Sequence, residues 1–259
     1  MLDHMNILGI DVGGSGIKGA PVDLDKGDFA MDRLRIPTPT KSSPANVAEV
    51  VGQICDHFKD HIGTDSRIGL TIPAPVVHGR VPFIANLHKS WTGLQADAFF
   101  EEALGRPVTL VNDADGAGLA EVHFGAAKGN DGVVIMTTLG TGIGTAIIHR
   151  GVLVPNAELG HLELAGHDAE TRAASSVKEN EKLSYKVWAK ERLQPYYAHL
   201  EMLFSPDLFV VGGGVSKDSE KFLPLLELRT PIVPAAMRNR AGIIGAALAA
   251  ADANDHPGH

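Results

Sequence analysis

VTLVNDADGAGLAE, residues 108–121, is the stretch around which the chain is organised. Its first four residues are β-branched or aliphatic, as in a buried strand, and the Ala- and Leu-containing segment that follows predicts a helix. Asn112 and Asp113 stand at the junction, where either side chain could cap the helix. Ligands of open α/β sheets bind beyond the carboxyl ends of the strands, so Asp113 is also placed where a substrate could meet it. This stretch leaves both roles open for Asp113.

Composition narrows the class of protein. The chain has 259 residues, of which 44% are hydrophobic, enough for one large or two moderate domains. Its formal net charge of -8 argues against a nucleic-acid or anionic-membrane partner, so an anionic ligand must bind locally. The single cysteine, Cys55, excludes disulfide frameworks and cysteine-based zinc sites, and we expect it to lie inertly in the core. No secretory signal is recognised, and a cytoplasmic protein is predicted.

Two glycine-rich turns have the same setting. Residues 8–22 and 133–148 each read as strand, glycine turn and strand, which predicts two related halves. Backbone N–H groups of such turns can form a nest for phosphate, and Asp11 could hold a hydrated Mg²⁺ beside it. The candidate phosphate-binding residues are Asp11, Gly13, Gly14, Ser15, Gly16 and Lys18 in the first half, and Thr138, Gly140, Thr141, Gly142 and Gly144 in the second.

A third glycine loop follows the predicted strand 208–211. Gly212, Gly213 and Gly214 stand at its carboxyl end, where a nucleotide could sit. The Ala-rich segment 241–252 is too short to span a bilayer, and with Gly242 and Gly245 it predicts a tightly packed helix.

The segment PNAELGHLE, residues 155–163, places Glu158 and His161 on one face of a helix or turn. A carboxylate and an imidazole can together bind neighbouring sugar hydroxyls, although a solvated helix end is an equal alternative. Trp91, near Asn86, suits either a sugar face or a core anchor. A metal site through His161 and His167 is not expected, because no third ligand has a recognisable spacing.

The remaining segments are assigned from periodicity. Residues 46–61 predict a helix, 68–72 a strand and 31–44 an exposed connection. Residues 178–204 form an amphipathic helical region in which Pro195 should cause a kink or a fresh start, and its apolar stripe suits the core or a subunit contact. Residues 254–259 are expected to be a disordered tail.

Taken together, these motifs resemble the sugar kinases of the ROK family. The resemblance rests on residues 11–14, 112–113, 139–144, 158–161 and 212–216, in the family's order over nearly the whole chain. More narrowly, residues 155–161, 168–170 and 241–247 look like the polyphosphate glucokinases of that family. The cysteine-rich zinc motif of many ROK proteins is absent between His161 and Glu170, and there is no N-terminal helix-turn-helix, which disfavours a regulator.

The resemblance implies an α/β, actin-like (ribonuclease H-like) fold of two duplicated domains with a central cleft. The domains would be residues 1–112, completed by the helix 241–253, and residues 113–240. The family's catalytic base falls on Asp113. The implied sugar ligands are Asn86, Asn112, Glu158, His161 and Glu170.

The implied reaction moves a phosphoryl group from inorganic polyphosphate, or in some members ATP, to the 6-hydroxyl of glucose with Mg²⁺. An ATP-dependent hexose kinase and a non-catalytic sugar sensor are the alternatives. The resemblance also implies a homodimer, for which the stripe 188–204 is a candidate surface. A basic track for polyphosphate is expected at Lys18, Arg80, Lys89 and Lys128, which could equally be ordinary solvated charges.

Overall fold

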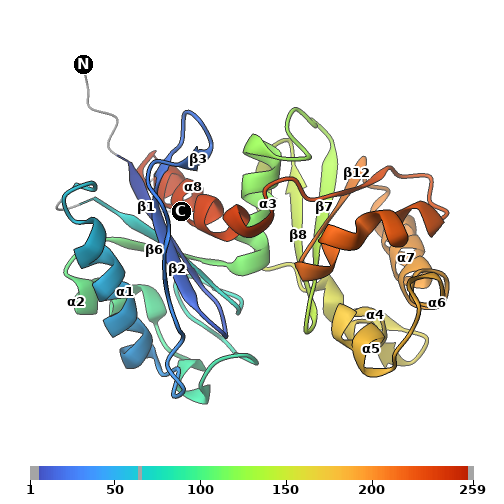
Figure 1. Ribbon diagram of the computed structural model, residues 1–259, viewed down its shortest axis with the longest axis horizontal. Coiled ribbons are helices and arrows are strands. Elements are labelled where there is room, and N and C mark those ends of the chain that lie inside the picture. The colour runs from blue at the N-terminus through green and yellow to red at the C-terminus, as the bar shows by residue number, and fades with distance from the viewer. Residues whose placement is uncertain (1–5, 64–65, 256–259) are drawn as a thin grey trace. The chain divides into compact units, whose positions relative to one another are not determined.

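The computed structural model describes residues 6–63 and 66–255 (Figure 1). These residues form two compact units. The first runs to Ala120 and resumes at Asn239, and the second spans Glu121–Arg238. The chain passes from the first unit to the second within helix α3 (Asp113–Phe124).

The first unit is built on a mixed sheet. Its strands are β1 (Ile7–Val12), β2 (Ile17–Asp23), β3 (Asp28–Phe29), β4 (Leu34–Ile36), β5 (Ile68–Ile72) and β6 (Val108–Asn112). The order is β3-β2-β1-β5-β6, with β4 also paired to β2; β1 and β2 are antiparallel, whereas β1, β5 and β6 are parallel. The first predicted strand, glycine turn and strand are therefore present. The predicted connection 31–44 is corrected, because β4 pairs with β2 inside it.

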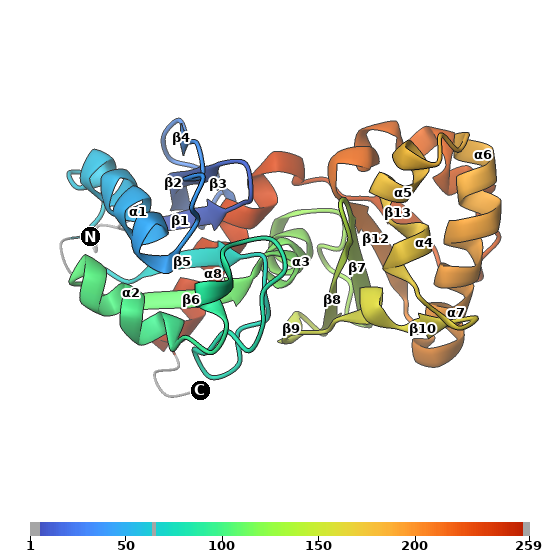
Figure 2. The same cartoon turned by 90° about the horizontal axis from the view of Figure 1, so that it is seen from below.

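Helices cover both faces of this sheet (Figure 2). Helices α1 (Pro44–Phe58) and α2 (Ala96–Leu104) contact one face, and α8 (Ala241–Asp255) contacts β1, β5 and β6 on the other. Helix α1 begins two residues before the predicted helix, because the hydroxyl of Ser43 accepts the Asn46 N–H and Pro44 occupies the first turn. Short 3₁₀ turns lie at Lys89–Trp91 and Arg238–Arg240.

Helix α8 packs closely on the sheet because glycines without side chains stand at the points of contact. A Cβ on Gly9 would lie 1.9 Å from the Ile243 carbonyl oxygen, and one on Gly69 would lie 1.8 Å from that of Ala246. On the helix itself, a Cβ on Gly245 would lie 1.8 Å from the carbonyl oxygen of Gly116. The predicted tight packing of this helix is confirmed.

The second unit repeats the first sheet. Its strands are β7 (Val133–Leu139), β8 (Ile143–His149), β9 (Val152–Val154), β12 (Leu208–Gly212) and β13 (Ile232–Pro234). Their order, β9-β8-β7-β12-β13, matches β3-β2-β1-β5-β6 position by position, with the antiparallel pair again joined by a glycine turn. This shared order confirms the predicted duplication and the α/β, actin-like class. A small ribbon, β10 (Glu163–Leu164) with β11 (His167–Asp168), stands apart from the sheet.

Helices α4 (Glu170–Ala173), α5 (Ser175–Asn180), α6 (Tyr185–Trp188) and α7 (Gln194–Phe204) belong to the second unit, with 3₁₀ turns at Leu159–His161, Gly214–Lys221 and Leu223–Leu225. A π-helical turn, Ala189–Leu193, lies between α6 and α7, so the fresh start predicted near Pro195 is confirmed. Trp188, Tyr196 and Tyr197 are fully buried. The aromatic part of the stripe is therefore core, and its use as a pairing surface is corrected.

Cys55 is buried and unpaired, and burial raises the pKa of its thiol to about 11, so the inert core role is confirmed. Helix α8 continues to Asp255, two residues into the predicted tail, and residues 256–259 lie outside the described part of the chain. Within residues 6–63 and 66–255, no helix combines the length and hydropathy needed to cross a bilayer.

Candidate active site

At the junction of β6 and α3, the structure assigns helix capping to Asn112 and leaves Asp113 exposed. The Asn112 side chain is buried, and its Oδ1 accepts the N–H groups of Ala114 at 2.9 Å and Asp115 at 3.2 Å. Asn112 is therefore the helix cap. Asp113 is exposed and begins the helix, with its Oδ1 accepting the adjacent Ala114 N–H at 2.8 Å. Because Asn112 does the capping, the Asp113 carboxylate can take up a proton without uncapping α3.

Asp11, at the end of β1, is fixed from several sides. Its Oδ1 accepts a hydrogen bond from the buried hydroxyl of Thr71 at 3.1 Å, and its Oδ2 lies 3.2 Å from the Lys18 ammonium. Helix α8 passes directly over it, since a Cβ on Gly242 would lie 3.0 Å from the Asp11 carboxyl carbon. The carboxylate is thus held in one orientation, and about a quarter of its side chain remains exposed, at 23%.

The first glycine turn keeps several N–H groups unused. The Gly13 N–H is bonded to the Gly16 carbonyl at 3.2 Å, while Gly14, Ser15 and Gly16 donate no backbone hydrogen bond to a described residue. Gly14 and Ser15 are exposed. None of these glycines has a positive φ, and the role of the turn as a phosphate nest stays a prediction. The exposed Asn86 lies beside this turn, its carbonyl oxygen 3.8 Å from a Cβ placed on Gly14.

The second turn is clamped by two serines of α5. The hydroxyl of Ser175 donates to the Gly140 carbonyl at 3.0 Å, and that of Ser176 donates to the Thr141 carbonyl at 2.7 Å. With its carbonyls held, the turn presents the exposed Thr141. Thr138, the residue before the end of β7, pairs with Gly144 on one side and Gly212 on the other. Gly213 packs on the turn so closely that a Cβ would lie 2.2 Å from the Leu139 carbonyl oxygen. The second turn and the loop 212–214 therefore form one glycine-lined corner.

The Glu158–His161 segment is fixed on β8. The buried hydroxyl of Thr145 accepts the Leu159 N–H at 2.9 Å and donates to the Ala157 carbonyl, which holds both neighbours of Glu158. Gly160 is required by contact, because a Cβ there would lie 2.2 Å from the Ile143 carbonyl oxygen. The spacing of Glu158 and His161 thus follows from a 3₁₀ turn, Leu159–His161, pressed on the strand.

Three predicted sugar ligands converge in this unit. The Nδ1 atom of His161 lies 2.9 Å from Asp168 Oδ2 and 3.9 Å from Glu170 Oε1. Glu170 is held by its Oε2, which accepts the Ile143 N–H at 3.0 Å. The hydrogen bond to Asp168 raises the pKa of His161, and burial, helped by the charge of Glu170, raises the pKa of Glu158. A set of mixed donors and acceptors results, which suits vicinal hydroxyl groups.

Comparison with known proteins identifies the family. Residues 7–182 match the ROK family. The chain belongs to the ROK family. It is 49% identical over 250 residues to a polyphosphate glucokinase of Mycobacterium tuberculosis, covering 96% of this chain and 92% of that protein. Among solved structures, an inorganic polyphosphate/ATP-glucomannokinase from Arthrobacter sp. strain KM is 50% identical with a TM-score of 0.90, covering 96% of this chain and 99% of that one. A ROK hexokinase from Thermus thermophilus is 26% identical with a TM-score of 0.76, covering 97% and 100%.

Several residues of this ROK protein that support the site escaped the sequence reasoning. Thr71, Thr145, Ser175 and Asp168 act through hydrogen bonds to residues between two and sixty positions away. A hydroxyl residue in a buried strand gives no periodic signal of such a bond. Asp168 could have been found, because it stands two residues before Glu170 in a segment already recognised. Of the two roles left open for Trp91, the structure shows the core anchor rather than the sugar face. Its side chain is fully buried and donates a hydrogen bond to the Ser42 carbonyl at 2.9 Å.

The expected basic residues of this ROK protein have varied surroundings. Lys18 is paired with Asp11, and Lys128 lies over the Phe124 ring at 6.0 Å from its centroid. Lys89 is exposed at the start of a 3₁₀ turn, and Arg80 lies near Gly93, with its Nη2 atom 3.4 Å from a Cβ placed there. Their use as a phosphate track stays a prediction.

Proposed function

We propose that this ROK protein transfers the terminal phosphoryl group of inorganic polyphosphate to the 6-hydroxyl of glucose, giving glucose 6-phosphate. The observation that carries the proposal is the convergence of Glu158, His161 and Glu170 in a chain so closely related to polyphosphate glucokinases. Carboxylates accept and an imidazole donates hydrogen bonds, so these three side chains would recognise ring hydroxyls. Asn112, through its amide Nδ2, and Asn86 would add further sugar contacts.

Asp113 would act as the general base. Its exposed carboxylate accepts the proton of the 6-hydroxyl while the oxygen forms a bond to the terminal phosphorus and the bond to the bridging oxygen of the donor breaks. The shortened polyphosphate leaves with the electrons of that broken bond. Phosphoryl transfer depends mainly on positioning and charge neutralisation, which the remaining groups would supply.

The donor phosphates would be held by the two glycine turns. The unused N–H groups of Gly14, Ser15 and Gly16, and the second turn with Thr138, Gly140, Thr141, Gly142 and Gly144, are the groups that we assign to them. The hard oxygens of Asp11 fit Mg²⁺ through water, although the Lys18 ammonium occupies one side of that carboxylate. When bound, Mg²⁺ would neutralise charge on the phosphates. Lys18 would exchange its partner from Asp11 to a phosphate.

ATP is a second donor that one observation favours. The related Arthrobacter enzyme is a polyphosphate/ATP-glucomannokinase by name, so ATP and mannose are both substrates to test. The corner of the second turn with Gly212, Gly213 and Gly214 would supply part of a nucleotide site. We rank polyphosphate as the better donor because the Mycobacterium relatives are named for it.

We also propose that the chain works as a homodimer in the cytoplasm, with domain limits after residues 112 and 240. The exposed Met202 and Leu203 of α7 are the part of the apolar stripe that could still meet a second copy. A monomeric mass in light scattering at micromolar concentration would contradict the pairing.

The deciding experiment measures glucose 6-phosphate formed from long polyphosphate and from ATP, each at low and high salt. We expect polyphosphate to be the better donor and its rate to fall more steeply with salt, because its binding draws on many screened charges. Activity with ATP and none with polyphosphate would reduce the function to an ATP-dependent hexose kinase. Glucose binding in calorimetry with no product from either donor would instead indicate a sugar sensor.

A further inference from the structure

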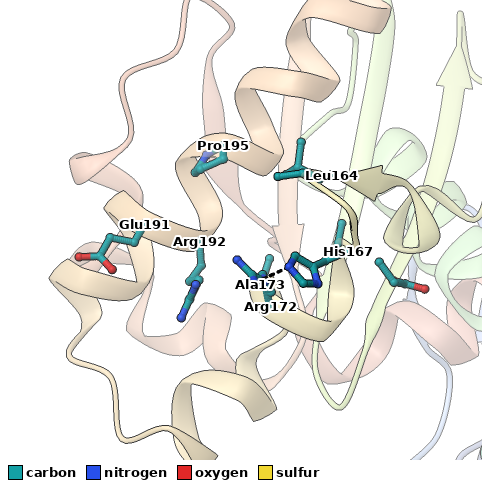
Figure 3. A pocket seen from close by; sticks show the side chains of 10 residues that line it. Leu164, His167, Arg172, Ala173, Glu191, Arg192 and Pro195 are labelled. Atoms are coloured by element: carbon teal, nitrogen blue, oxygen red, sulfur yellow. Dashed lines mark hydrogen bonds between the residues drawn. The ribbon is translucent and has the colours of Figure 1, made fainter.

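A pocket lies in the unit formed by Glu121–Arg238, beside the ribbon β10–β11. It has a volume of about 240 Å³ and is lined by His167, Arg172, Arg192 and apolar residues that include Leu164 and Pro195 (Figure 3). The known range of small-molecule sites begins near 300 Å³, so this pocket suits a ligand smaller than a nucleotide. None of these residues has a part in the reaction described above.

The pocket contains a cation without an acidic partner. The Nη2 atom of Arg172 lies 2.5 Å from Nε2 of His167, and no carboxylate of a described residue pairs with this guanidinium. Figure 3 shows this contact between the two side chains as a dashed line. Because a neutral imidazole nitrogen is a weaker partner for arginine than an anion, a phosphate group could displace it and take two N–H bonds from the fork.

Arg192 adds a second, independent signal. Its guanidinium is bonded to Glu181 at 3.1 Å, but its Nε is buried and has no acceptor among the described residues. Buried N–H groups normally have a partner, so this Nε is an unsatisfied donor on a residue that lines the pocket.

The acidic lining residues do not oppose an anion directly. Glu191 is exposed, and its carboxylate points away from the Arg172–His167 pair in Figure 3. Asp168 also lines the pocket, and both of its oxygens have partners, Oδ2 in His161 and Oδ1 in the Glu170 N–H at 3.3 Å. Arg172 thus remains a positive charge of the lining with no carboxylate partner among the described residues.

We propose that this pocket binds a small phosphate-bearing molecule, with Arg172 and His167 holding the phosphate group. Free phosphate and the phosphate monoester of a sugar share this chemistry. The apolar wall at Leu164 and Pro195 favours the monoester, whose carbon skeleton would cover it. Since His167 and Asp168 are consecutive, an occupied pocket would adjoin the residue that orients His161.

The test follows the ring resonances of His167 by NMR, identified by their loss in His167→Gln. Inorganic phosphate and glucose 6-phosphate are titrated separately into the full chain, the Arg172→Gln variant and a control, Lys186→Gln. Lys186 is an exposed cation of the same unit that does not line the pocket. The local probe separates this pocket from phosphate bound at the catalytic groups.

We expect both ligands to shift His167 in the parent and in K186Q, and R172Q to weaken binding about tenfold or more. Tighter binding of glucose 6-phosphate assigns the pocket to the monoester, and equal binding assigns it to free phosphate. The site is overturned if the His167 ring resonances do not shift at about 10 mM ligand, ten times a millimolar dissociation constant. It is also overturned if R172Q binds the ligands with unchanged affinity. If R172Q does not fold, Arg172→Lys keeps the charge, and loss of the bidentate fork should still weaken binding severalfold.

Discussion

Nδ1 of His161 lies 2.9 Å from Oδ2 of Asp168, across the hairpin formed by β10 and β11. This bond fixes the ring, so that its other nitrogen, Nε2, is left to contact a ligand. The same carboxylate stabilises the protonated ring. His161 is therefore both oriented and kept more basic by a residue that we do not place in contact with substrate.

Asp168→Asn should lower the pKa of His161 toward the ordinary value of 6.5, because the largest cause of its increase is removed. In the parent, the favourable contribution of protonated His161 to stability is complete below that ordinary value and is lost as pH rises through the raised pKa. The chemical shifts of the histidine ring, followed against pH, measure the pKa of His161 in the parent and in D168N. An unchanged midpoint in D168N would contradict the role of Asp168, and Asp218→Asn, in the separate 3₁₀ turn Gly214–Lys221, is a control that should leave His161 unaffected.

Glu158→Gln should separate stability from sugar recognition. Burial raises the pKa of Glu158, so the folded state prefers the protonated side chain and the ionised form costs stability as pH rises above the ordinary value of 4.5. The neutral isostere should therefore melt at the same temperature or higher at pH 7, while KM for glucose rises at least tenfold through loss of a charged acceptor. Thermal unfolding and steady-state kinetics on one preparation decide this. A lower melting temperature with an unchanged KM would show that Glu158 is a structural residue.

Substitutions of Asn112 and Asp113 should affect different properties, stability in the first case and turnover in the second. Asn112→Ala removes the cap of α3 and should lower the free energy of unfolding by about 0.5–2 kcal/mol. Asp113→Asn leaves that cap intact and should keep stability and glucose binding, but lose turnover because no base remains. Denaturant unfolding and turnover assays of both variants measure the difference. If D113N retained turnover within about tenfold of the parent, Asp113 would not be the base.

Alanine should have opposite effects on stability at two glycines, one packed against α8 and one within α1. Gly69→Ala would place a Cβ 1.8 Å from the Ala246 carbonyl oxygen, so we expect loss of several kcal/mol or no folded protein. Gly52 lies within α1, and a Cβ there meets Leu104 at an ordinary 3.8 Å. Gly52→Ala should therefore stabilise the protein by about 0.5–1 kcal/mol through helix propensity. Unfolding curves that move in the same direction for both variants would refute the account.

Much of this fold could be predicted from local sequence. The two hairpins, the helix at 241 and the restart at Pro195 depend on glycine turns, apolar spacing and proline, whose effects reach only a few residues along the chain. The motif around Glu158 and His161 was likewise recognisable from its spacing. Local rules specify these features because the groups that interact are neighbours in sequence.

Tertiary structure decided what depends on partners distant in sequence. Whether Asn112 or Asp113 capped α3 was settled by which side chain turned toward the helix, and the aromatic stripe became core because other elements covered it. Thr71 reaches Asp11 across two paired strands, and Asp168 reaches His161 across a hairpin. Such bonds form when packing brings the groups within about 3 Å, a condition that no periodicity encodes. The sequence therefore determined which chemical groups this ROK protein possesses, and the folded chain determined which of them are held, charged and exposed.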